Sequence, residues 1–303
     1  MLRRVALLVA CGVTCGCNGK AASPVPAPVV RAVLGTAAVT ACEPLPFAAS
    51  TPVAEASGAA WLTIDGVSRL VVVSDSGNHG EYGLIDPDTG ATVERGRLPL
   101  NGSTDDLEGL ATRGDHLFGI TSPGWVLEWK RVANGFELVA GPTALGPVDL
   151  PPNGGLGDKP PHGDGMVCDG TRSNCGRNYE GLCLTEHGGY AAAKADGHLY
   201  PVTGDTTLKV ERAGAIAVAE PGHLADCAYD EHDTLYVGNN LFGLSTVSRI
   251  DQGPGGDKVV PIASLGMGFP EVLAVRGDVF YRMSDMGGSP SLMGKFRCKP
   301  SAR

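Results

Sequence analysis

Short apolar runs separated by turns recur along the chain, and no stretch keeps an apolar face at helical spacing over three turns. In the first repeat this pattern predicts four strands, at 59–64, 69–74, 81–86 and 91–99. The 44 glycines and 22 prolines would interrupt most helices. The chain is therefore expected to be all-β.

A short phrase introduces each group of strands. It is clearest at residues 106–111 (DLEGLA) and 178–183 (NYEGLC), and looser copies stand at 56–60, 223–228 and 269–274. When the copies are aligned on the glycine of the phrase, this position falls at residues 58, 109, 181, 226 and 272. The successive spacings are 51, 72, 45 and 46 residues. A period near 45 residues is typical of one four-stranded propeller blade. The long step is explained by an insert at about 146–177 that has no strand pattern.

The last repeat is one strand short of a full blade. Propellers commonly complete such a blade with a strand from the other end of the chain, which removes an open sheet edge. The segment 29–40 is apolar enough to serve as that strand. Counting motifs predicts five blades, and a sixth would follow if residues 29–55 and the insert conceal another.

Several phrases together resemble a known family. Residues 73–78 (VSDSGN), 106–110 (DLEGL) and 179–182 (YEGL), followed by Lys194, are similar to the SdiA-regulated and esterase-like phytase-type propellers, over most of residues 56–285. The resemblance implies six blades, so six are preferred to five. It also implies an alternative activity, a metal-dependent hydrolase of phosphoesters or simple esters.

The N-terminus has the order of a bacterial export signal. Two arginines, a short apolar run and small residues precede a cysteine, which predicts a lipoprotein signal peptide at 1–16 with Cys17 as the lipidated residue. Cys15 is the next choice, and an ordinary cleaved signal is the competing interpretation. Residues 17–28 are rich in proline and alanine and are expected to tether a folded domain, 29–303, to the membrane of the cell envelope, either the outer membrane or one facing the periplasm.

Six of the nine cysteines follow the signal region, and an even number in an exported chain suggests three disulfides. Fifteen connectivities are possible, and zinc binding is the competing interpretation, although no pair has the usual zinc-ligand spacing. The positions of the cysteines in the repeats favour the pairs Cys168–Cys175, Cys183–Cys227 and Cys42–Cys298.

The chain is acidic, with a formal net charge of −9. This charge argues against nucleic acid as a partner. A small molecule, a glycan or another envelope protein is expected instead, with membrane contact only through the lipid anchor.

Blade topology predicts where a site would lie. First strands start, and second strands end, at the same face of a propeller, so acidic residues at these points should surround one mouth of the channel. The candidate ligand-binding residues are Asp75, Glu108, Glu180, Lys194, Asp226, Asn239, Glu271 and Asp285. Four of them are candidate Ca²⁺ ligands: Asp75, Glu108, Glu180 and Glu271. The competing interpretation is that the glutamates cap backbone amides and hold the blades in register.

Catalytic signatures are missing from the sequence. There is no G-x-S-x-G, no H-E-x-x-H and no Walker loop. His162 and His223 are the histidines expected nearest to the channel, and residues 86–90 (DPDTG) are expected to form a turn rather than a calcium loop. Ligand or partner binding at an acid-lined mouth is the preferred function, and hydrolysis by a metal-activated water is the alternative.

Overall fold

The computed structural model describes residues 30–31, 33–34, 42–102, 105–146, 177–205, 207–241, 244–253, 256–265, 267–288 and 290–299. The predicted signal peptide (1–16), the tether (17–28) and nearly all of the insert (146–177) lie outside the described residues.

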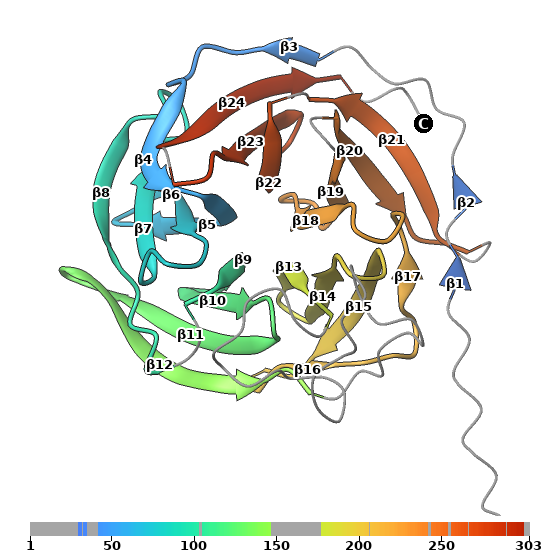
Figure 1. The fold of residues 1–303 in the computed structure, drawn as a ribbon, viewed down its shortest axis with the longest axis horizontal. Coiled ribbons are helices and arrows are strands. Elements are labelled where there is room, and N and C mark those ends of the chain that lie inside the picture. The colour runs from blue at the N-terminus through green and yellow to red at the C-terminus, as the bar shows by residue number, and fades with distance from the viewer. Residues whose placement is uncertain are drawn as a thin grey trace, which may run out of the picture.

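Five sheets surround a central channel, and each sheet is one blade of a β-propeller (Figure 1). The regular structure of the described residues is strand throughout, and they include no helix of the length and hydrophobicity needed to cross a membrane. The predicted all-β propeller is therefore confirmed, with five blades in the described chain, one of the two counts that the repeats allowed. No sixth blade comes from residues 29–55, because their described part pairs with other blades.

Each of the first two blades is an antiparallel sheet of four consecutive strands, numbered from the channel outward. Blade one consists of β5 (Ala56–Ile64), β6 (Val67–Ser74), β7 (Glu81–Ile85) and β8 (Thr92–Arg97). Blade two consists of β9 (Leu107–Arg113), β10 (His116–Thr121), β11 (Trp125–Val132) and β12 (Gly135–Ala144). Residues 86–90 form the predicted turn between β7 and β8.

The other three blades follow the same plan. Blade three has β13 (Tyr179–Thr185), β14 (Gly188–Ala193) and β15 (His198–Thr203), with β16 (Lys209–Val210) and β17 (Ile216–Ala217) outside. Blade four has β18 (Leu224–Tyr229), β19 (Leu235–Leu241), β20 (Leu244–Asp251) and β21 (Lys258–Ser264). Blade five has β22 (Phe269–Arg276), β23 (Val279–Asp285) and β24 (Pro290–Cys298).

The N-terminal segment completes blade five and extends two others. β3 (Cys42–Pro44) and β4 (Ser50–Ala54) pair antiparallel with β24, so the last blade is closed from the other end of the chain, as predicted. The closing residues are 42–54 and not the predicted 29–40. In that earlier stretch, β1 (Val30–Arg31) pairs in parallel with β17 of blade three, and β2 (Val33–Leu34) pairs with β21 of blade four.

Buried apolar residues form five clusters in the described chain, one between each pair of neighbouring blades. Between blades one and two, the ring of Tyr82 packs edge-on against Phe136 at 5.1 Å, and Trp129 donates a hydrogen bond to the carbonyl oxygen of Pro99. Burying a large apolar side chain contributes roughly 1.5–3 kcal/mol. Each blade is therefore stabilised mainly through its neighbours, which allows one chain of this length to fold without a single large core.

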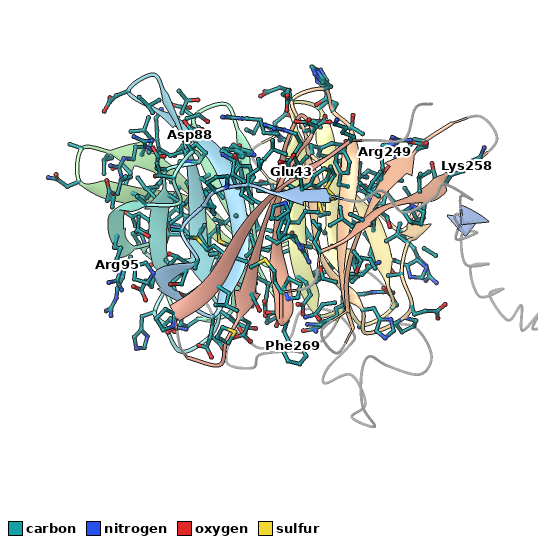
Figure 2. All side chains as sticks on the ribbon, turned by 90° about the horizontal axis from the view of Figure 1, so that it is seen from above. Glu43, Asp88, Arg95, Arg249, Lys258 and Phe269 are labelled. Carbon is teal, nitrogen blue, oxygen red and sulfur yellow. A yellow bond between two sulfur atoms is a disulfide. The ribbon has the colours of Figure 1, made fainter. Side chains whose placement is uncertain are left out.

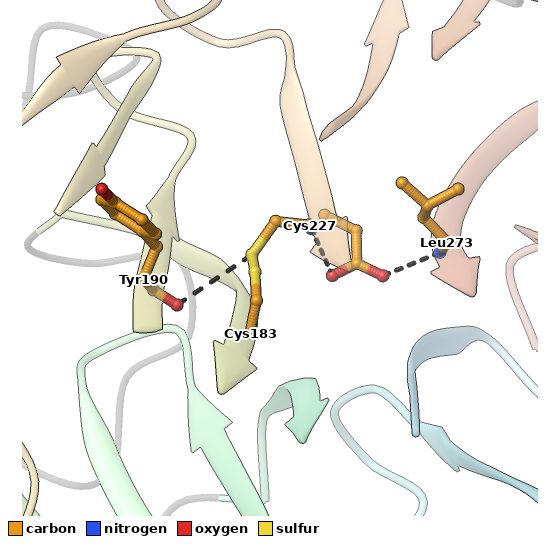
Figure 3. Close-up of a disulfide and its surroundings, with 5 residues drawn as sticks. Cys183, Tyr190, Cys227 and Leu273 are labelled. Carbon is orange, nitrogen blue, oxygen red and sulfur yellow. Dashed lines mark hydrogen bonds between the residues drawn. A yellow bond between two sulfur atoms is a disulfide. The ribbon is translucent and has the colours of Figure 1, made fainter. Parts of the chain in front are cut away.

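Two of the predicted disulfides are present. Cys42 of β3 is bonded to Cys298 of β24, and Cys183 of β13 is bonded to Cys227 of β18 (Figure 3). The first joins the two ends of the described domain, and the second joins the inner strands of neighbouring blades. The third predicted pair, Cys168–Cys175, lies outside the described residues.

Candidate functional site

The five inner strands begin with the same irregularity. In each blade the pairing of the first strand with the second skips one residue, which is therefore the extra residue of a β-bulge. The bulge residues are Ser57, Glu108, Glu180, Ala225 and Glu271. Three predicted glutamates thus occupy equivalent positions at one end of the channel, which we call the mouth.

The second strands end at the same face. Phe269, at the start of β22, marks this face at the lower rim of Figure 2, whereas Asp88 lies toward the opposite rim. Four residues at the second-strand ends donate a backbone hydrogen bond to the carbonyl oxygen just before the inner strand: Asp75, Ser122, Lys194 and Asn240. The predicted site residue Asn239 therefore lies one residue before the position that is equivalent to Asp75 and Lys194. Asp285 has the corresponding position in blade five, opposite Phe269.

Three carboxylates meet between blades one and two, and we call them the carboxylate trio. Oxygen atoms of Asp75, Asp106 and Glu108 all lie within 4.8 Å of one another. Asp106 also accepts a hydrogen bond from the hydroxyl of Ser122. Asp106, the first residue of the repeated phrase, was not among the predicted site residues. The trio has the donor chemistry and spacing of a site for a hard cation.

Burial makes ionisation of the trio costly. It raises the pKa of Asp75 to about 7, and the negative charges of Asp106, Glu271 and Asp285 act in the same direction. Burial also raises the pKa of Glu108, which is 3% exposed, and the carboxylates of Glu180, Asp75 and Asp106 add to this effect. Carboxyl groups crowded in this way become fully ionised only when positive charge or protons compensate them.

Two further acidic residues, one on blade three and one on blade five, contact the side chain of Lys194. The ammonium nitrogen of Lys194 lies 2.8 Å from Glu180 Oε2 and 3.4 Å from Glu271 Oε1. The other oxygen of Glu180 accepts a hydrogen bond of 2.8 Å from the side-chain amide of Asn178. We call Glu180, Lys194 and Glu271 the lysine triad.

Burial and the shared lysine act in opposite directions on the pKa values of Glu180 and Glu271. Burial alone would lower the pKa of Lys194, but the charges of Glu180 and Glu271 outweigh it and hold the pKa above its usual range. Burial raises the pKa of Glu180 to about 8, against the opposing effect of Lys194. Glu271 shifts in the same direction for the same reason. The lysine stays protonated, and it can neutralise only one of its two partners at a time.

Asp226 and Arg282 belong to the wall behind the mouth. The carboxylate of Asp226 accepts backbone hydrogen bonds of 2.7 Å from Cys227 and from Leu273 of the next blade (Figure 3). Arg282 is fully buried and donates to the carbonyl oxygens of Pro270 and Val272, on either side of Glu271. Asp226, a candidate ligand-binding residue, thus performs the capping that the competing interpretation gave to the glutamates, while Arg282 fixes the bulge that carries Glu271.

Behind the mouth the channel becomes narrow and apolar. A Cβ atom added to Gly109 would lie 2.6 Å from the backbone nitrogen of Leu182, so the inner strands of blades two and three touch through their backbones. Farther along, residues such as Trp61, Leu184 and Val275 line a cavity of about 70 Å³. None of the described residues that line this cavity is charged.

The structure brings together five of the predicted site residues: Asp75, Glu108, Glu180, Lys194 and Glu271. Asp285 lies beside them on blade five, where its charge acts on Asp75 and Glu271. His223 has the position before the inner strand of blade four, where its carbonyl oxygen accepts a hydrogen bond from Asn240. His162 lies outside the described residues.

Comparison with known proteins identifies no family for this chain. No family model and no curated protein matches the sequence, so the resemblance to SdiA-regulated and phytase-type propellers stays a prediction. Similar solved structures include a PQQ-bound aldose sugar dehydrogenase from Streptomyces coelicolor, at 15% identity over 86% of this chain and 98% of that chain, with a TM-score of 0.49. Glutaminyl cyclase from Myxococcus xanthus is 14% identical over 90% and 100%, with a TM-score of 0.47. Virginiamycin B lyase from Staphylococcus aureus is 12% identical over 87% and 89%, with a TM-score of 0.43. The activities in these names belong to those proteins and are not assigned to this chain.

Proposed function

We propose that this protein binds a divalent cation, with Ca²⁺ as the first candidate, at the mouth of its channel, and binds a small ligand or a partner protein through that cation. The observation that carries the proposal is the approach of Asp75, Asp106 and Glu108 to within 4.8 Å of one another. Ca²⁺ takes six to eight oxygen ligands, so the trio would supply about half of them. The remainder are left for a ligand's oxygen atoms or for water.

The charge of the mouth supports a cationic occupant. Asp285, Glu180 and Glu271 lie around the trio, and Lys194 forms ion pairs with the last two of these. A bound divalent cation would compensate carboxylates that burial otherwise makes costly to ionise.

The setting that we propose is the bacterial cell envelope. Two disulfides are the cross-links of an oxidising compartment, and a lipid on Cys17 would attach the propeller to a membrane surface through the proline-rich tether. Mass spectrometry of the mature protein should find a lipid on its N-terminal cysteine. An unmodified N-terminus would contradict this part of the proposal.

Calorimetric titration with Ca²⁺ tests the binding site. The wild type should bind one ion, and Asp75→Asn or Glu108→Gln should weaken binding at least tenfold because each removes a charged ligand. Asp88→Asn is the matched control, since Asp88 is an exposed acid toward the opposite rim and its side chain is 92% exposed. Equal affinity in all four proteins, or no binding by any of them, would refute the proposal.

A further inference from the structure

The ammonium group of Lys194 occupies the position of a cation in the mouth. We propose that the mouth is built for two cations, that Lys194 permanently fills one position, and that it thereby limits the protein to a single bound metal ion. The single metal ion rests on the proposed function, whereas the position filled by Lys194 is argued from the lysine triad alone.

The contacts of Lys194 are those of a bound cation. Its nitrogen lies between Glu180 Oε2 and Glu271 Oε1, at 2.8 Å and 3.4 Å, and its side chain is 18% exposed. Its backbone is fixed on both sides, because its N–H donates to Asn178 and its carbonyl oxygen accepts from Gly222. Ca²⁺ binds oxygen at 2.3–2.6 Å, so a metal ion in this position would need the two carboxylates to move closer by less than about 1 Å.

Comparison of the blades shows why the two halves of the mouth differ. Lys194 has in blade three the position that Asp75 has in blade one, at the end of the second strand. Blade four, between Glu180 and Glu271, has Ala225 as its bulge residue and contributes no carboxylate there. A reversal of charge at equivalent positions thus gives one half three carboxylates and the other half two carboxylates with a lysine.

The side chain of Asn178, which contacts Glu180 through its amide nitrogen, also carries a buried oxygen atom. Asn178 is only 8% exposed, and its amide nitrogen donates to Glu180. The amide oxygen of the same side chain, Oδ1, is buried and accepts no hydrogen bond from any residue that the structure describes. Glu180, Glu271 and Asn178 together therefore offer the oxygen chemistry that a hard cation requires.

The test replaces the lysine and counts bound ions. Lys194→Ala removes the ammonium group and leaves space for a metal ion, so we expect this variant to bind one Ca²⁺ more than the wild type in calorimetric titration. Lys194→Arg keeps the positive charge and should bind the same number as the wild type. The double variant Lys194→Ala/Glu271→Gln loses a ligand of the new position and should return to the wild-type number.

Two further outcomes separate this inference from the proposed function. If the wild type binds no ion and Lys194→Ala binds one, the inference holds and the proposed trio site fails. If Lys194→Ala binds the same number as the wild type, the inference is wrong. Should Lys194→Ala unfold without metal, its thermal unfolding with and without Ca²⁺ decides: stabilisation by Ca²⁺ that is absent in the double variant supports the inference, and its absence refutes it.

Discussion

Asp226 shows how a buried acid behind the mouth can serve the fold rather than a ligand. It stands at the register position that glycine has in blades one to three, and its two oxygens accept backbone hydrogen bonds from Cys227 and Leu273. Burial raises its pKa, while these two hydrogen bonds and the charge of Arg282 act in the opposite direction. Asp226 thereby links blade four to blade five.

Asp226→Ala should destabilise the protein by about 2–6 kcal/mol, because it leaves two buried backbone N–H groups without acceptors and each costs roughly 1–3 kcal/mol. Urea unfolding measures the difference. Asp88→Ala, at an exposed position, should change stability by less than about 0.5 kcal/mol. A loss for Asp226→Ala no larger than that of the control would show that the two hydrogen bonds contribute little.

The raised pKa values at the mouth predict the pH dependence of stability in the absence of metal. Between pH 4 and their folded pKa values, about 7 for Asp75 and about 8 for Glu180, these groups bind a proton in the folded state but not in the unfolded state. Raising the pH through this window therefore destabilises the fold. The midpoint of thermal unfolding should be higher at pH 5.5 than at pH 8.5.

Substitution identifies the groups responsible for this dependence. In Asp75→Asn/Glu180→Gln the difference between the two pH values should become smaller, since neither new side chain titrates. Saturating Ca²⁺ should also reduce it in the wild type. A midpoint that rises from pH 5.5 to pH 8.5 in the wild type would contradict the assignment.

At the scale of elements, the β-bulge and the residue after it determine the shape of the channel. The bulge turns its own side chain toward the mouth, and the next residue brings neighbouring inner strands into backbone contact. Gly109 lies so close to blade three that a Cβ atom would be 2.7 Å from the Cα atom of Gly181. Packing thus requires the glycine at positions 58, 109 and 181, whereas blades four and five have Asp226 and Val272 there.

Gly109→Ala should destabilise the protein by about 1–3 kcal/mol, since the added methyl group meets backbone that cannot move aside without shifting a blade. Chemical denaturation is the measurement. Gly253→Ala is the matched control, because a Cβ atom at Gly253 meets nothing within 4 Å and its backbone needs no left-handed conformation. Equal stability of the two variants would show that blades two and three can separate freely.

The repeated phrase predicted much of the structure because it combines a strand start, a bulge and a close contact in six residues. Positions 58, 109, 181, 226 and 272 pair equivalently with their second strands. The role of Asp106 was not predictable because it depends on Asp75 of the preceding blade, which comes near only when blade two packs against blade one. The pairing of β1 and β2 was also not predictable, since a two-residue parallel pair has no periodicity to detect.

For the whole molecule, closure of the ring depends on two strands from one end of the chain and one covalent bond. β3 and β4 cover the edge of β24, and the Cys42–Cys298 disulfide joins residues 256 positions apart. The pairing of β3 with β24 includes these two cysteines and only two further residue pairs. The covalent bond therefore reinforces the ring at a place where few backbone hydrogen bonds hold it closed.

Cys42→Ser/Cys298→Ser should lower the free energy of unfolding by about 5 kcal/mol in the loop-entropy model, because the bond restricts a loop that spans most of the unfolded chain. Equilibrium unfolding of the variant and the wild type under non-reducing conditions measures this. A difference below about 1 kcal/mol would mean that β3 and β4 close the ring adequately without the bond.

The same disulfide determines how the molecule would respond to a mechanical pull between its two ends. Tension along the chain would first detach β1 and β2, which are held by two residue pairs each. It would next reach Cys42, and from there the load passes through a covalent bond to Cys298 on β24. Residues 43–297 lie within the loop that this bond closes, so a pull between the two ends of the chain bypasses the blades, and only β1 and β2 detach.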